Sequence, residues 1–120
     1  MKSIIAGLAI AAGMTIAGSS TAIDMPPLAI KDNCVACHAI DKKVVGPAWM
    51  DVSKRYKDAT TYTYRGKVYP LLDGLVLKVE RGGAGNWGSM PMPGNSPAVS
   101  ESDIREIVKF ELGLAKSPSK

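Results

Sequence analysis

Cys34-Val35-Ala36-Cys37-His38 is the stretch that decides how this chain folds, because it gathers both cysteines and the only histidine of the 120 residues. Two thiols three residues apart lie on one turn of the chain, and the histidine follows directly. This spacing is typical of covalent haem c attachment, in which the thiols reach the two vinyl groups of one porphyrin. We therefore expect Cys34 and Cys37 to bond one haem c and His38 to bind its iron.

Three other kinds of site use a C-x-x-C pair, and the rest of the chain argues against each of them. A zinc site usually has four protein ligands, and no other cysteine or histidine is present to complete one. A redox-active dithiol would be expected in a thioredoxin-like βαβ context, which the sequence does not supply. A disulfide that closes so short a loop would stabilise the chain little.

The N-terminus has the three parts of a secretory signal peptide. Met1-Lys2 is positively charged, residues 4–18 are largely apolar, and Ser20-Thr21-Ala22 offers small residues for cleavage. The sequence thus predicts removal of residues 1–22, cleavage near Ala22 and a periplasmic protein. An uncleaved anchor is the alternative, but the apolar run is shorter than the roughly 20 residues that span a bilayer. We therefore expect no stable membrane insertion.

Residues 23–120 are short enough to form one domain. A chain of this size buries a marginal core by itself, and a large apolar cofactor at its centre would add much of the missing burial. The formal net charge of the whole chain is only +4. This charge does not indicate a nucleic-acid partner, and we expect a monomer.

The mature chain is predicted to be mostly helical. We expect helices over residues 28–36 and 48–56, a third that begins at Pro70 and ends at Gly82-Gly83, and a last one capped by Ser100. Residues 82–97 are expected to form a loop. The last two helices each carry apolar residues at helical spacing, which are Leu71, Leu72, Leu75, Val76 and Val79, and then Ile104, Ile107, Val108, Phe110 and Leu112.

The segment 61–69 breaks the helical pattern. It alternates β-branched, aromatic and polar residues around Arg65-Gly66, which predicts a short β-hairpin.

The iron is expected to take a second axial ligand opposite the histidine. With no second histidine in the chain, the thioether of methionine is the natural choice. Met25 lies too close to the N-terminus, and Met50 belongs to a predicted helix. Met90 and Met92 remain, in a proline-rich loop whose restricted backbone can hold a weak ligand in place.

Two stretches of the chain resemble one known family. CVACHAIDKKVVGPAWMDVSKRY, residues 34–56, and GNWGSMPMPGN, residues 85–95, look like the small monohaem class I cytochromes c of bacteria. In particular they resemble the short periplasmic electron carriers of denitrifying and ammonia-oxidising bacteria. The resemblance implies an all-α class I cytochrome c fold wrapped round one haem, here with the possible hairpin at about 61–69 as an insertion.

The resemblance also implies roles for single residues. Met92 would be the distal iron ligand, and the carbonyl of Pro47 would accept a hydrogen bond from the other ring nitrogen of His38. Trp87 would reach a haem propionate with its indole N–H, and Lys78 would lie near the same propionate.

The chain departs from the family in two places. Ala29 stands where relatives often carry an aromatic residue, and Phe110 and Leu28 are expected to make up the contact. The insertion has no family role to inherit. It could pair its phenols and cations with the propionates, dock a partner, or be a solvated hairpin without function.

The implied function is electron transfer, not enzymatic catalysis. The protein would shuttle single electrons through a His/Met-ligated haem c between redox proteins of a respiratory chain, such as cytochromes, oxidases or reductases. One alternative is a haem subunit or docking module of a larger redox complex. The other is a ligand-binding or peroxidase-like haem protein whose methionine is absent or easily displaced.

Overall fold

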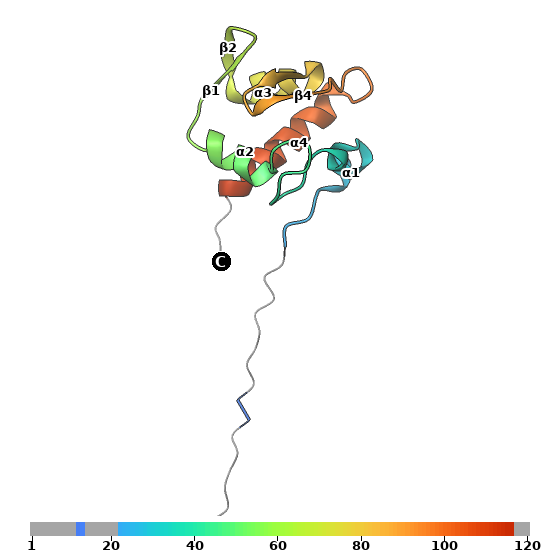
Figure 1. The fold of residues 1–120 in the computed structure, drawn as a ribbon, viewed down its shortest axis with the longest axis vertical. Coiled ribbons are helices and arrows are strands. Elements are labelled where there is room, and N and C mark those ends of the chain that lie inside the picture. The colour runs from blue at the N-terminus through green and yellow to red at the C-terminus, as the bar shows by residue number, and fades with distance from the viewer. Residues whose placement is uncertain (1–11, 14–21, 117–120) are drawn as a thin grey trace, which may run out of the picture.

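The computed structural model describes residues 12–13 and 22–116, so the expected signal peptide lies almost wholly outside the described residues. Figure 1 shows a mostly helical fold with two small sheets, which confirms the predicted fold class. No helix in the described part of the chain is long and apolar enough to cross a membrane. The elements are α1 (Pro27–Lys31), the 3₁₀ helix η1 (Cys34–Ala36), α2 (Trp49–Tyr56), β1 (Thr61–Tyr64), β2 (Lys67–Pro70), α3 (Leu71–Arg81), β3 (Gly83–Gly85), β4 (Gly88–Met92), α4 (Glu101–Gly113) and the 3₁₀ helix η2 (Leu114–Lys116).

The N-terminal segment is not the single helix that we expected over residues 28–36. Helix α1 ends at Lys31, and the chain restarts as the separate turn η1. Between them Asn33 has a left-handed backbone with φ 62°, a conformation that asparagine tolerates better than most residues. The cysteine motif is therefore presented by a short turn of its own.

The hairpin is present as predicted, with Tyr62 paired to Tyr69 across the antiparallel strands β1 and β2. Its turn residues Arg65 and Gly66 both have positive φ, 49° and 78°, as a type I′ turn requires. The side chains of Tyr62 and Tyr64 are only 5% and 6% exposed, because alternation along β1 turns both toward α3 and α4. The hairpin is therefore not solvated throughout, since the inward face of β1 forms one wall of the core, while β2 is largely exposed.

The second sheet, β3 with β4, was not predicted, because we expected residues 82–97 to be a loop. The strands pair Gly83 with Met92 and Gly85 with Gly88. Glycine and proline are depleted in ordinary strands, so the composition of this segment hides its ladder. Its effect is to place Met92 beside the C-terminal end of α3.

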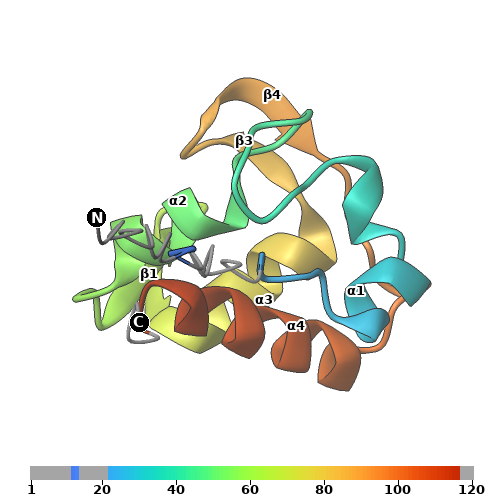
Figure 2. The same cartoon turned by 90° about the horizontal axis from the view of Figure 1, so that it is seen from below.

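Helix α4 is the element against which α1, α2 and α3 all pack. Figure 2 shows α4 along one side of the molecule, with β3 and β4 at the opposite side and α1 and α2 at its flanks. As predicted, the hydroxyl of Ser100 caps the helix by accepting a hydrogen bond from the Asp103 amide at 3.2 Å. At the other end, the buried hydroxyl of Ser53 donates to the Leu112 carbonyl and accepts from the Ala115 amide, both at 2.9 Å.

Two apolar clusters pack on this helix. The first joins the hairpin, α3 and α4 through Tyr62, Val76 and Ile104. The second contains the fully buried Ala29 with Leu28 and Phe110 around it, which is the compensating contact expected from the sequence.

Candidate haem-binding site

A cavity of about 590 Å³ opens between the motif turn, α2, α3, α4 and the β3–β4 sheet. This volume lies in the ordinary range for cofactor sites. All seven site residues that the sequence predicts line it, which are Cys34, Cys37, His38, Pro47, Lys78, Trp87 and Met92. Segments that lie far apart in the sequence are therefore brought to one place by the fold.

The cysteine motif is held by hydrogen bonds within the turn. The Cys34 carbonyl accepts from the amides of Cys37 at 3.2 Å and His38 at 3.0 Å. Both cysteines are half-buried and free of any disulfide. Burial raises the pKa of the Cys34 thiol, and the nearby carboxylates of Asp32 and Glu111 raise it further. Reactive dithiols have a lowered pKa instead, so this environment does not suit a thiol-exchange site.

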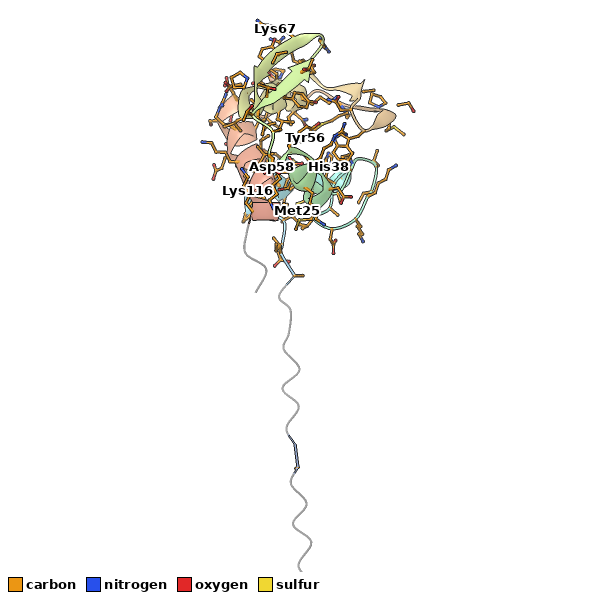
Figure 3. All side chains as sticks on the ribbon, turned by 90° about the vertical axis from the view of Figure 1, so that its left-hand side faces the viewer. Met25, His38, Tyr56, Asp58, Lys67 and Lys116 are labelled. Atoms are coloured by element: carbon orange, nitrogen blue, oxygen red, sulfur yellow. The ribbon has the colours of Figure 1, made fainter. Side chains whose placement is uncertain are left out.

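The imidazole of His38 is fixed by its surroundings. Its Nδ1 lies 2.8 Å from the carbonyl oxygen of Pro47, which is the hydrogen bond expected from the sequence. A carbonyl can only accept, so Nδ1 carries the proton and Nε2 keeps its lone pair for a metal. The ring also lies against Gly46, where an added Cβ would come within 2.5 Å of His38 Cε1. Figure 3 places His38 inside the folded part of the chain, between Lys67 at one end and Met25 and Lys116 at the other.

The two candidate methionines differ in burial. Both belong to β4, and alternation along the strand turns them toward the same side. Both residues line the cavity, but Met90 is 64% exposed, whereas Met92 is half-buried. Burial thus favours Met92 as the ligand.

The backbone around Met92 is tied to α3. The side-chain amide of Asn95 donates to the carbonyls of Val79 at 3.1 Å and Pro93 at 3.3 Å. Gly82 ends α3 with φ 74°, and a Cβ there would overlap the carbonyl oxygen of Met92. The close approach of these two backbones therefore requires glycine at position 82.

We expect Gly82→Ala to displace the Met92 segment. The variant combines a strained positive φ with a backbone clash, so its free energy of unfolding should fall by roughly 1–2 kcal/mol more than that of Gly85→Ala. Gly85 is the matched control because its φ is also positive, 120°, while an added Cβ meets no atom within 4 Å. Denaturant unfolding of both holoproteins measures the difference. Equal losses of stability would contradict the role of Gly82.

Cations and hydrogen-bonding groups gather at the Trp87 end of the cavity. The guanidinium carbon of Arg55 lies 4.6 Å from the centre of the Trp87 ring, and Arg55 also donates to the Asn86 carbonyl. Lys78 donates to the Gly83 carbonyl, and burial lowers the pKa of its ammonium group, with Arg65 adding to the effect. This end suits an anionic group such as a carboxylate of the cofactor.

Sequence reasoning missed several residues of this cavity. Tyr62 lines it from the hairpin and accepts a hydrogen bond from the Asn86 side chain. Asn95 and Glu111 also belong to the wall. The available signal for Glu111 was its spacing, since it stands four residues after Ile107 and three after Val108, on the apolar face of α4.

The donors in the cavity are those that haem c requires, namely two thiols, one imidazole nitrogen with a free lone pair and one thioether. The family model "Cytochrome c" matches residues 27–114, which hold all of these donors. The chain belongs to the cytochrome c family.

Individual cytochromes c are similar over nearly the whole chain. Cytochrome c-551 of Allochromatium vinosum is 42% identical over 102 residues, which cover 84% of this chain and 95% of the relative. Cytochrome c-552 of Nitrosomonas europaea is 36% identical over 117 residues, 95% of this chain and 99% of the relative. The crystal structure of wild-type Nitrosomonas europaea cytochrome c552 matches with a TM-score of 0.61 and 37% identity, over 72% of this chain and 95% of that structure.

Membership of the cytochrome c family settles the cofactor and the general activity. The protein carries one covalently attached haem c, for which the C-x-x-C-H motif supplies both cysteines. Cytochromes c are electron carriers, and the resemblance to the small bacterial class I members is confirmed.

Proposed function

We propose that this cytochrome c is a periplasmic carrier that shuttles single electrons between proteins of a respiratory chain, with His38 and Met92 as the axial ligands of its iron. The observation that carries the proposal is that both residues line one cavity with both cysteines, while the Pro47 carbonyl fixes the imidazole tautomer. The signal-peptide pattern of residues 1–22 supports export. In this role the protein is an electron carrier and not an enzyme.

Haem c supplies a one-electron iron couple when bound. Residues of the chain fix the positions of both iron-binding side chains. Gly46 and Pro47 contact the imidazole of His38, and Asn95 is hydrogen-bonded beside Met92. Because these contacts lie outside the iron's coordination, they can persist in both oxidation states, so little has to reorganise. A soft thioether in an apolar cavity favours ferrous iron and raises the reduction potential.

The surface beside the motif suits brief encounters with redox partners. Val35 and Val44 are exposed there, at 39% and 46%, and Val45 borders the cavity next to them. Lys42 and Lys43 are exposed next to them. Apolar contact ringed by charge gives a weak, electrostatically steered complex.

The test mixes the reduced holoprotein with candidate oxidases and reductases from its host and follows reoxidation in a stopped-flow spectrometer. We expect rapid transfer to at least one acidic partner, with a rate that falls as salt screens the charges. Replacing Lys42 and Lys43 with glutamine should slow transfer by roughly tenfold or more.

Lys57→Gln with Lys109→Gln is the matched control, because both lysines are exposed and stand far from the motif in sequence. This variant should keep the rate of the unmodified protein. Slow, salt-independent transfer to every partner, together with peroxide consumption by the holoprotein, would favour the peroxidase-like alternative.

A further inference from the structure

Glu111 places a carboxyl group in the wall of the haem cavity. It lies in the last turn of α4, on the face that Ile107 and Val108 also present to the cavity. Ile107 and Val108 are 5% and 1% exposed, so Glu111 interrupts an otherwise apolar stripe. As a residue Glu111 is only partly covered, since part of it borders the cavity, but the protein around its carboxyl group desolvates that group. Electron transfer by His/Met-ligated iron does not require a carboxyl group at this place.

The surroundings of Glu111 disfavour its charge. Burial raises the pKa of the carboxyl to about 8, and no cation contributes an opposing effect. The C-terminal end of a helix carries a partial negative charge, which also disfavours an anion there. The carboxyl acts electrostatically on Cys34 and on Tyr56, since it raises the pKa of both. Glu111 thus lies within electrostatic range of a sulfur atom that bonds the porphyrin.

Other ionisable groups share this environment. They come from the motif segment, α2, the hairpin and α3, whereas β3 and β4 contribute none, and they include the propionates of the cofactor itself. Within the protein they are Asp32 before η1, His38 and Lys43 after it, Asp51 and Tyr56 on α2, Tyr62 on β1 and Lys78 on α3.

Burial and the charge of the cofactor act on the carboxyl in opposite directions. Ferric haem carries one positive charge more than ferrous haem, so the oxidised protein favours the carboxylate. In the reduced protein this attraction is lost, and desolvation favours the neutral acid. The affinity of Glu111 for a proton must therefore be higher in the reduced protein than in the oxidised one.

We propose that Glu111 is a redox-linked proton-binding site, which takes up one proton from water when the protein is reduced and releases it when the protein is oxidised. The electron comes from the donor protein and leaves to the acceptor protein, while the proton converts carboxylate to carboxylic acid and back. One electron and one proton thus enter together, and the net charge of the site stays constant. This inference rests on the proposed role of the protein as an electron carrier.

The first test is a spectroelectrochemical titration of the holoprotein from about pH 4 to about pH 10, a range that brackets the ordinary and the raised pKa of a carboxyl. Full coupling makes the reduction equilibrium tenfold less favourable per pH unit, which is about 59 mV for a one-electron couple. We expect a slope approaching this value over part of the range in the unmodified protein and loss of that slope in Glu111→Gln. Glu106→Gln is the matched control, because Glu106 is exposed on the same helix.

A slope that persists in Glu111→Gln belongs to other groups, such as the propionates, and overturns the proposal. The methionine-to-iron charge-transfer band should remain in Glu111→Gln. Absence of this band from the unmodified protein would contradict the proposed axial ligands. It would not affect the test of Glu111, which depends only on how the reduction potential changes with pH.

The second test needs no variant to fold. Infrared difference spectra between the oxidised and reduced holoprotein should show a protonated carboxyl band that appears on reduction and shifts in D₂O. A pH indicator in weakly buffered solution should report the uptake of up to one proton per electron. If neither the infrared band nor proton uptake accompanies reduction of the unmodified protein, the proposal is wrong.

Discussion

Replacing Cys34 and Cys37 together with alanine is expected to give a chain that neither carries covalent haem nor keeps its fold. The cavity of about 590 Å³ would then lose the bonded group that fills it. A chain of this size buries only a marginal core by itself, so losing the apolar group that fills its centre removes a large share of its stability. Small domains are stable by only about 5–15 kcal/mol in total.

Mass spectrometry and circular dichroism measure the two effects. The unmodified mature protein should have the mass of residues 23–120 plus one haem and no free thiol, whereas the double variant should lack both the added mass and the helical signal. Val35→Ala is the control, because Val35 lies between the cysteines and is 39% exposed. A double variant that retains the covalent haem mass or the helical content would contradict this prediction.

Met92→Ala should change the electronic spectrum and the potential far more than Met90→Ala. Loss of the half-buried thioether removes the soft donor that favours ferrous iron. The methionine charge-transfer band should disappear, and the reduction potential should fall by about 100 mV or more, a modest part of the roughly 0.8 V range that axial ligands span. Met90→Ala, at a side chain that is 64% exposed, should keep the band.

Absorption spectra and potentiometry decide between the two methionines. Loss of the band in Met90→Ala but not in Met92→Ala would mean that Met90 is the axial ligand. The alignment of this loop with the cytochrome c family would then be wrong by two residues, one Pro-Met pair.

The sequence predicts most of this site because its chemistry is concentrated in rare residues. The chain has one histidine and two cysteines, so the motif at positions 34–38 has no competitor. The hairpin was also predictable, because Arg65-Gly66 stands as a turn between two segments of alternating residues. The burial of Tyr62 and Tyr64 could not be predicted in the same way. Alternation along a strand shows that its two faces differ, but it does not show which element will cover either face.

The missed features have local causes. The break at Asn33 falls in Asp32-Asn33-Cys34-Val35, a run of weak helix formers in which Asn33 adopts a left-handed backbone. The β3–β4 ladder is built from residues that rarely form strands. Glu111 was passed over because apolar residues alone were counted along α4, although its spacing from Ile107 places it on the same face.

The turn η1 has a consequence for the order of haem attachment and folding. Its hydrogen bonds join residues only three and four positions apart, from the Cys34 carbonyl to the amides of Cys37 and His38. Closing so short a loop needs no distant part of the chain. An unfolded chain can therefore present both thiols to a haem as a linear peptide, and the helices can then assemble around a cofactor that is already bonded.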